Sequence, residues 1–358
     1  MTVRITFLGT GGGRHTTMYQ TRCTGGMLIE HGTNPVHHLH IDPGPGALVQ
    51  MNHIRYDLGK TESVIISHAH PDHYSDAPSV IEGMTRGGWK KRGHVYGSPS
   101  VINGDGDLGP CLSPYHLSLV EGVQAFRPGD VLDVDGMQVD ICKAQHSDPT
   151  NVGFRFHTEQ GIVSYVSDTE YTEEIAKQYI GSRVLILPVT TPHANQIKFH
   201  LCTDTAIEFC KIVQPELCVF IHLGIVMIRQ GPAAQAQMCQ QTTGIRTVAG
   251  EDLMVLDIGE RLQLSRARTH TGEWYPRWSP QMPGKTNGSQ RRNGNRPRGE
   301  RNRHQPPRAP MGETAADAAS TSPDQLHRRG RRSHHRGRGG REQKSNDGEA
   351  LLTAPPAR

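Results

Sequence analysis

Three histidines and one aspartate fall within the short segment SHAHPDH at 67–73, namely His68, His70, Asp72 and His73. The β-branched run ESVIISH at 62–68 predicts a buried strand that ends where this cluster begins. Imidazole and carboxylate groups at a strand end are common ligands of divalent metals. The turn after the strand would bring His68 and His70 to one point, and Asp72 and His73 to a second point nearby. Two metals placed so closely polarise a scissile group and hold a hydroxide nucleophile.

Each metal needs further ligands, because catalytic zinc takes about four to five. Three single residues follow other predicted strands: His146 in AQHSDPT, Asp168 in VSDTEY and His222 in FIHLG. Asp168 could bridge both metals. The sequence thus predicts two ligand sets that share Asp168: His68, His70 and His146 on one metal, and Asp72, His73 and His222 on the other.

Two other groups of residues resemble functional motifs but favour other interpretations. His37, His38 and His40 alternate along a predicted strand without matching carboxylates, so we do not expect them to bind a catalytic metal. FLGTGGG at 7–13 follows a strand, but no helix is predicted after it, which argues against a dinucleotide-binding loop. We expect these glycines to form a tight turn near the metal site, with the loop IDPGPGAL at 41–48 beside it.

Short β-branched runs bounded by Gly, Pro and Asp predict many strands, with helices between the later ones. The order of these elements favours an α/β fold in which two packed sheets carry helices outside, an αββα sandwich. Predicted strands cover 3–9, 25–31, 37–44, 62–68, a pair in 125–146, a hairpin in 151–168 turned at 159–161, 183–189 and 216–222; predicted helices cover 76–85, 172–180, 203–213 with Thr203 as N-cap, and 232–244 closed by Gly244.

Two segments depart from this pattern. Residues 86–118 are rich in Gly and Pro, with a basic stretch at 90–92, and predict an insertion or long loop in a domain of residues 1–264. Residues 1–264 carry 19 Lys and Arg against 27 Asp and Glu, a net charge of −8, whereas residues 265–358 carry 20 against 8, a net charge of +12. The Arg- and Gly-rich composition of 265–358 predicts a disordered basic tail, which either contacts RNA or another polyanion or is a solubilising extension.

Cysteine usage and hydropathy bear on localisation. The seven cysteines are odd in number and form no CxxC pair, which favours reduced thiols in a cytosol over a disulfide framework. The N-terminal MTVRITFLGTGGGR lacks the apolar region of a signal peptide, and no apolar run approaches the roughly 20 residues of a spanning helix. We therefore expect a cytoplasmic protein.

The HxHxDH string, followed in order by the single His146, Asp168 and His222, resembles the metallo-β-lactamase superfamily. The resemblance covers most of 1–264 and leaves the tail outside. FLGTGGG, IDPGPG and HLCTDTA at 200–206 are similar to its phosphodiesterase branch, which includes ribonuclease Z, and the body resembles uncharacterised archaeal and bacterial hydrolases of the ribonuclease Z-like group. This implies two Zn²⁺ ions, with Mn²⁺ or Fe as alternatives, and a homodimer as a frequent assembly.

In the phosphodiesterase branch a histidine shortly before a helix contacts the scissile phosphate, and His200 stands at that place. A helix N-terminus also suits an anion. The implied reaction is attack of a metal-bound hydroxide on a phosphodiester, with Asp72 orienting the nucleophile and His200 assisting the leaving oxygen. Unlike ribonuclease Z, the stretch LPVTTPH at 187–193 has no acidic residue, and no tRNA-binding arm is evident in the usual place.

Three alternatives to a phosphodiesterase stay open at this point. The same two metals could hydrolyse a lactone, thioester or carboxylic ester. Some relatives of the resembled family bind iron and perform redox or sulfur chemistry, although the full set of imidazole and carboxylate ligands favours zinc. A metal-stabilised body could also deliver the basic tail to RNA without any turnover.

Overall fold

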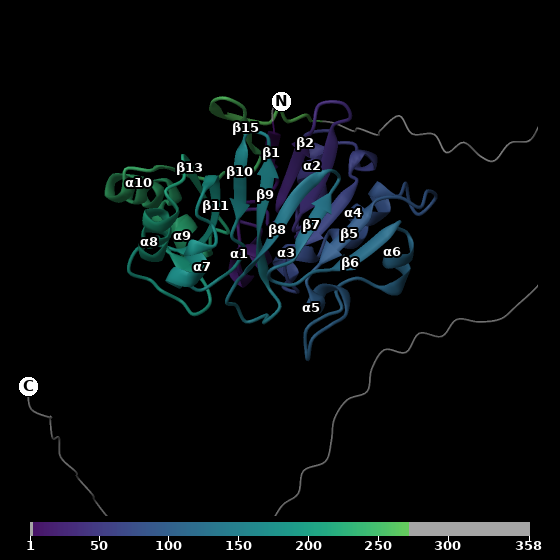
Figure 1. Ribbon diagram of the computed structural model, residues 1–358, viewed down its shortest axis with the longest axis horizontal. Helices are drawn as coiled ribbons and strands as arrows, with labels where there is room; N and C mark the ends of the chain where they lie inside the picture. The colour runs from purple at the N-terminus through teal and green to yellow at the C-terminus, as the bar shows by residue number, and fades with distance from the viewer. Residues whose placement is uncertain (1–2, 272–358) are drawn as a thin grey trace, which may run out of the picture. The chain divides into compact units, whose positions relative to one another are not determined.

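The computed structural model describes residues 3–271, which form two packed β-sheets with helices on their outer faces (Figure 1). Each sheet has eight strands, counting β12, which pairs with β11 beside the main path of the second sheet. The predicted αββα sandwich is confirmed. Of the predicted tail at 265–358, residues 272–358 lie outside the described residues.

The first sheet has the strand order β16-β15-β1-β2-β3-β4-β5-β6. Strands β3, β4, β5 and β6 are parallel, and the other neighbours in this sheet are antiparallel. Its strands are β1 Val3–Phe7, β2 Met27–His31, β3 His37–Ile41, β4 Ser63–Ile66, β5 His94–Gly97, β6 Gly122–Ala125, β15 Met254–Ile258 and β16 Leu262–Arg266.

The second sheet has the strand order β14-β13-β11-β10-β9-β8-β7. Antiparallel pairing joins β7 to β8, β8 to β9 and β9 to β10, and the remaining pairs are parallel. Its strands are β7 Val131–Val134, β8 Met137–Lys143, β9 Val152–Thr158, β10 Gly161–Tyr165, β11 Ser182–Thr191, β12 Leu201–Cys202, β13 Leu217–Ile221 and β14 Arg246–Ala249.

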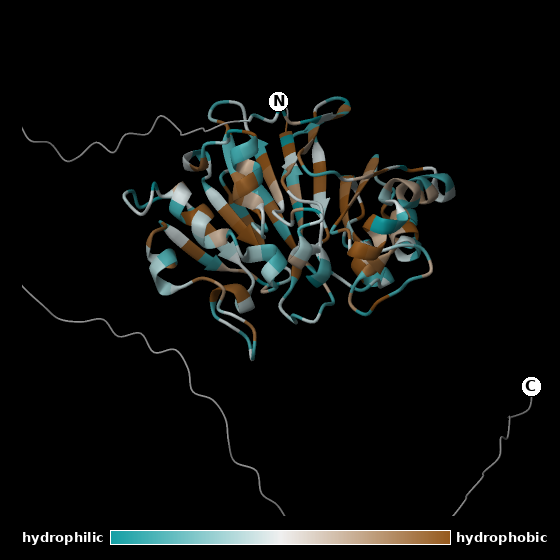
Figure 2. Ribbon diagram, turned by 180° about the vertical axis from the view of Figure 1, so that it is seen from behind, coloured by the Kyte–Doolittle hydropathy of each residue, from teal (hydrophilic) through white to brown (hydrophobic). Residues whose placement is uncertain are grey.

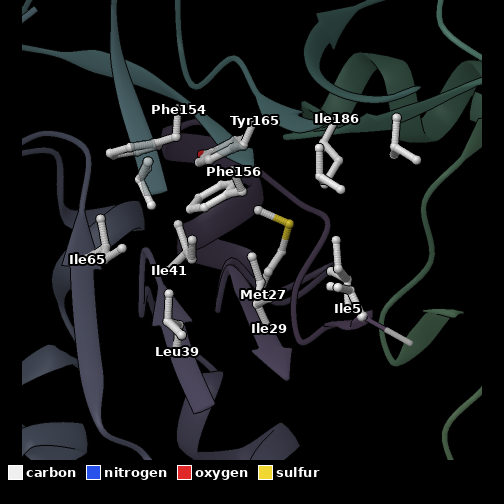
Figure 3. Close-up of a cluster of buried hydrophobic side chains, with 14 of the residues drawn as sticks. Ile5, Met27, Ile29, Leu39, Ile41, Ile65, Phe154, Phe156, Tyr165 and Ile186 are labelled. Atoms are coloured by element: carbon white, nitrogen blue, oxygen red, sulfur yellow. The ribbon is translucent and has the colours of Figure 1, made fainter. Parts of the chain in front are cut away.

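The central strands are apolar on both faces because both faces are covered, and Figure 2 shows these strands as mainly hydrophobic. Side chains alternate between faces along a strand. In β4, Ile65 points into the core between the sheets, whereas Val64 and Ile66 pack in the cluster beneath the helices of the first sheet. In Figure 3, Phe154, Tyr165 and Ile186 of the second sheet face residues of the first sheet across the inner core: Leu39, Ile41 and Ile65.

Helices cover both outer faces of the sandwich. Buried residues of α2 and α4 belong to the cluster outside the first sheet, and those of α7, α8 and α10 belong to the cluster outside the second. The predicted helices at 76–85, 172–180, 203–213 and 232–244 are confirmed. The helices are α1 Arg14–Tyr19, α2 Ala47–His53, the 3₁₀ turn Leu58–Lys60, α3 Pro71–Tyr74, α4 Ala77–Met84, α5 Pro99–Ile102, α6 Pro114–Ser118, α7 Glu173–Lys177, α8 Thr203–Val213, α9 Ile225–Gln230 and α10 Pro232–Thr243.

The structure corrects four predictions of detail. Residues 86–118 are not simply an insertion or loop, since they contribute β5, an internal strand between β4 and β6, together with α5 and α6. A short helix, α1, does follow the glycines of FLGTGGG. Cys202, not Thr203, is the N-cap of α8. The body extends past 264, because β16 pairs with β15 as far as Arg266.

Two further findings concern the thiols and the helices. All seven cysteines are free thiols, which agrees with the prediction from their odd number and spacing. Within residues 3–271, no helix is long and apolar enough to cross a membrane.

Candidate metal centre

The cluster segment turns sharply after β4, and this turn separates its four polar residues into two pairs. His70 is the N-cap of α3 in an extended conformation, and Pro71 is the first helical residue. Proline suits that position because its fixed φ is helical and the first turn needs no N–H donor. His68 and His70 therefore precede the helix, whereas Asp72 and His73 lie in its single turn.

His68, His70 and His146 form the first ligand group. His68 Nε2 lies 3.0 Å from His70 Nδ1, and His146 Nε2 lies 3.0 Å from the same His70 atom. Their ligand atoms all lie within 4.8 Å of one another. Three imidazole nitrogens that converge on one point form a donor set that suits a divalent metal.

Asp72, His73 and His222 form the second ligand group. Asp72 Oδ2 lies 3.2 Å from His222 Nε2 and 3.8 Å from His73 Nε2. Asp168 lies between the two groups, with one oxygen close to both, as the sequence predicted. Distances from Asp168 Oδ2 are 3.1 Å to His222 Nε2, 3.5 Å to His73 Nε2, 3.8 Å to His146 Nε2 and 4.0 Å to His68 Nε2.

Two buried polar atoms in this cluster have no hydrogen-bond partner within the described chain, His73 Nε2 and Asp168 Oδ1. Leaving a buried polar group unsatisfied costs about 1–3 kcal/mol, and more for a charged group. A divalent cation held by the second group would satisfy His73 Nε2 and bind the Asp168 carboxylate through Oδ2, the oxygen that faces the histidines. The residues therefore fit a metal centre, and their nitrogen and oxygen donors suit zinc, manganese or iron.

Asp42, directly after β3, forms a hydrogen bond to the second ligand group on the side away from the metal position. Its Oδ2 accepts hydrogen bonds from Nδ1 of His73 at 2.9 Å and from the Tyr165 hydroxyl at 2.8 Å. Its Oδ1 accepts the Ser67 backbone N–H at 2.7 Å. A carboxylate in this position fixes the ring and presents Nε2 to the metal. The loop at 41–48 was predicted to lie beside the site, but Asp42 was not predicted, although its place at a strand end matches that of the ligands.

Other supporting residues were also not predicted. The Thr190 hydroxyl lies 3.0 Å from Nδ1 of His222, and Nδ1 of His146 lies 3.1 Å from the Phe199 carbonyl. Asp148 accepts the Ala69 backbone N–H at 2.9 Å, which anchors the cluster segment between His68 and His70. No residue pattern in the sequence marks such partners, because they come from separate elements.

The charges of the site are set by burial and by its own carboxylates. Without a bound metal, burial lowers the pKa of His146 to about 4 and that of His68 well below its usual value. Burial also lowers the pKa of His222, but Asp168 and Asp72 outweigh it and raise the pKa to about 9. The first group thus offers neutral imidazoles, whereas metal binding at the second group must displace protons.

The glycines after β1 approach the second group closely. The Gly13 backbone N–H donates to Asp72 Oδ2 at 2.8 Å. A Cβ on Gly12 would lie 2.1 Å from Cδ2 of His222, so any side chain there would displace the ring. The prediction that these glycines form a turn near the site is confirmed.

An open cavity of about 840 Å³ leads to the cluster and includes His70, Asp72, Asp168 and His200 in its lining. His200 Nε2 lies 3.7 Å from Asp168 Oδ2, and its ring stacks on that of His222 with centroids 5.8 Å apart. His200 precedes α8, as predicted. The structure therefore brings all eight predicted site residues into one region.

Comparison with known proteins agrees with this geometry. The family described as "Beta-lactamase superfamily domain" matches residues 37–223, a range that contains every candidate ligand. The uncharacterized protein MJ1374 of Methanocaldococcus jannaschii is 38% identical over 250 residues, which span 69% of this chain and 92% of that protein. Ribonuclease Z of Methanosarcina acetivorans is 29% identical over 148 residues, which span 41% of this chain and 46% of that enzyme. The metallo-β-lactamase fold protein YhfI of Bacillus subtilis aligns with a TM-score of 0.60 and 18% identity, covering 72% of this chain and 99% of YhfI.

The chain therefore belongs to the metallo-β-lactamase superfamily. Within it, the chain is a metallo-hydrolase of the ribonuclease Z-like branch. The resemblance drawn from the HxHxDH string and the later single ligands is confirmed.

Proposed function

We propose that the protein is a phosphodiesterase that uses two divalent metal ions to hydrolyse nucleic acid or a small or cyclic phosphodiester. The observation that carries this proposal is the position of His200. It lies outside the two ligand groups defined above, although its ligand atom lies within 4.8 Å of those of His146 and Asp168. Its side chain keeps 21% exposure, and its Nε2 lies 3.7 Å from the carboxylate between the groups. A histidine at this place is suited to protonate or stabilise a leaving oxygen.

In this proposal the first ligand group and Asp168 hold one ion, and the second ligand group and Asp168 hold the other. Zn²⁺ is the first choice for these donors, with Mn²⁺ or Fe as alternatives. When bound, two such ions supply a hydroxide nucleophile at neutral pH and neutralise charge on a phosphoryl oxygen.

The protein's own groups then orient the reactants. Gly13 N–H holds the Asp72 carboxylate, which orients the attacking nucleophile. The ring of His200 is held by a contact of Nδ1 with the Lys198 carbonyl at 3.0 Å, which leaves Nε2 for the substrate. Arg14, on α1, lines the same cavity and offers a cation to the phosphate.

The charge of the cavity supports an anionic substrate. Among the described residues that line it, the carboxylates are Asp72 and Asp168, both candidate ligands, and Arg14 carries a fixed positive charge. Two divalent ions would outweigh the two carboxylates and make the cavity cationic, which favours a phosphodiester over a neutral ester.

This proposal does not restrict the substrate to one kind of phosphodiester. The match to ribonuclease Z spans about half of that enzyme, and residues 187–193 lack an acidic residue. We therefore do not restrict the substrate to tRNA precursors. RNA remains a candidate substrate, and the basic segment 265–358 would add phosphate contacts to a nucleic-acid complex.

One observation favours a second candidate, a lactone or thioester hydrolase. The cavity is also lined by apolar side chains, with Met18, Ile197 and Val226 exposed by 64%, 39% and 37% of their surfaces. Such a rim would suit an acyl chain, and the same two ions would act on a carbonyl.

Turnover of bis(p-nitrophenyl) phosphate, a lactone and a thioester by metal-loaded protein tests both candidates. His200→Gln should lower phosphodiester turnover by about 100-fold, within the usual range for general acid–base catalysis. His193→Gln is the matched control: this histidine lies in the same loop, but its side chain is 54% exposed and pairs with Asp204. Turnover of the lactone or thioester alone, or equal phosphodiester rates for both variants, would contradict the phosphodiesterase proposal.

A further inference from the structure

A second polar cluster lies at the opposite end of the first sheet from the candidate metal centre. It contains His37 at the start of β3, Glu62 just before β4 and Asp135 in the turn between β7 and β8. Both β3 and β4 run from this cluster toward the catalytic end. The five residue-to-residue steps from Ser63 to His68 span roughly 16 Å of extended chain. The two clusters therefore share no ligand.

The three side chains form a compact donor set. One nitrogen of His37 and one oxygen each of Glu62 and Asp135 all lie within 4.8 Å of one another, and His37 Nδ1 lies 2.8 Å from Glu62 Oε2. The Ser63 hydroxyl donates to Asp135 Oδ2 at 2.7 Å, which fixes the carboxylate from behind. No carboxylate lies at ligand spacing from His37 along the strand. The structure supplies two carboxylates from two other elements.

His31 provides an independent indication of a ligand. It is 8% exposed, and its Nε2 is buried without a hydrogen-bond partner among the described residues. Its ring stacks on that of His37, with centroids 5.3 Å apart and planes inclined by 28°. Both histidines and Asp135 line one cavity of about 500 Å³. Burial lowers the pKa of His31, so its ring does not add a positive charge beside the three donors.

We propose that His37, Glu62 and Asp135 bind a divalent transition metal at a structural site separate from the catalytic one, with His31 beside them in the same cavity. One imidazole and two carboxylates match the donor types that Zn²⁺ prefers. The ion would join the β7–β8 turn of the second sheet to the adjacent ends of β3 and β4 in the first. It would therefore hold the two sheets together at this end.

The test uses the full-length chain with His70→Ala and Asp168→Ala, which remove one candidate catalytic ligand and the shared one. This background protein is dialysed against Zn²⁺ and compared with versions that also carry His37→Gln or His38→Gln. His38 is the matched control: it is the next residue on β3 and pairs with Glu30 at 3.4 Å, outside the cluster. Because all versions keep the same tail histidines, zinc bound by the tail cancels in the comparison.

Metal analysis should find one Zn²⁺ fewer per chain in the His37→Gln version than in the background or in the His38→Gln version. The affinity for Zn²⁺ should fall by more than about 100-fold, since a direct ligand matters more than an outer-shell partner. Added Zn²⁺ should raise the melting temperature of the background and His38→Gln versions through this site, and His37→Gln should remove that rise.

Asp135→Asn gives a second test if His37→Gln impairs folding. Asp135 lies in a turn with a φ of 51°, a conformation that asparagine tolerates, and the substitution removes the charge of one donor. It should lower the Zn²⁺ affinity as well. Equal zinc content and equal zinc-dependent stabilisation in all versions would overturn the proposal.

Discussion

Replacing Asp42 with asparagine would show how much metal affinity depends on a residue outside both ligand groups. Asp42 is 2% exposed, and its Oδ2 accepts three hydrogen bonds: from His73 Nδ1 at 2.9 Å, the Tyr165 hydroxyl at 2.8 Å and the Ser67 hydroxyl at 2.8 Å. Asparagine keeps the volume but removes the negative charge and one of the two acceptor oxygens. The His73 ring would then lose the group that fixes its orientation.

The size of the effect follows from this geometry. Outer-shell partners of metal-binding histidines are worth about 10–100-fold in metal affinity, or about 1.4–2.7 kcal/mol. We expect the upper end, about 100-fold, because Asp42 is buried and contacts His73 directly. Tyr165→Phe is the control: it removes one of the three donors to Oδ2 and leaves the contact with His73. It should lower the unfolding free energy by about 1–3 kcal/mol and change metal affinity by less than about threefold.

Competition with a chromogenic chelator would measure Zn²⁺ affinity for the full-length wild type and both variants. Circular dichroism would confirm that each variant is folded. The reasoning would be refuted if Asp42→Asn bound Zn²⁺ as tightly as the wild type. It would also be refuted if Tyr165→Phe weakened binding as much as Asp42→Asn, because the effect would then come from general destabilisation of the core.

Three further predictions concern packing, charge and the inner core. Gly12→Ala should weaken binding of the second metal by at least about tenfold, as measured by chelator competition, because its Cβ would lie 2.1 Å from Cδ2 of His222; unchanged affinity would mean that the loop shifts freely. In the chelator-treated protein, the pKa of His222 is about 9, above its unfolded value of about 6.5. The stabilisation from His222 is therefore complete below pH 6.5 and is lost as the pH rises through 9. Urea unfolding should show a decrease of up to about 3 kcal/mol from pH 6.5 to 10, and flat stability over this range would contradict the assignment. Phe154→Ala should lower the unfolding free energy by about 3–5 kcal/mol, because Phe154 is fully buried and packs edge-to-face on Phe126 at 5.6 Å; a loss below 1 kcal/mol would show that the core closes over the gap.

Much of the fold was predictable because its signals are local. The buried strands are continuous apolar runs such as RVLILPV, and the helix at 203–213 has its apolar residues at helical spacing. The hairpin at 151–168 was marked by its turn residues at 159–161. Strand β5 was missed because it is only four residues long, His94–Gly97, and lies among glycines and prolines that normally indicate a loop. Pairing with β4 and β6 on either side stabilises it there.

The candidate ligands could also be identified in the sequence, because each follows a strand and the HxHxDH string leaves few structural explanations. The sequence by itself therefore determined which residues could bind metal and in what order they occur. It did not determine which residues form hydrogen bonds to these ligands and fix their orientation. Asp42 lies 31 residues before His73 in the chain. The two side chains meet because β3 and β4 are neighbours in the sheet.

The same distinction applies at the opposite end of the sheet. The sequence shows His37 beside His38 and His40 and offers no carboxylate at ligand spacing. The tertiary structure brings Glu62 from the next strand and Asp135 from the other sheet within 4.8 Å. Local sequence patterns report hydrophobic periodicity and turn chemistry, which act over a few residues. Contacts between side chains of different strands depend on sheet order and register, so only the packed structure decided them.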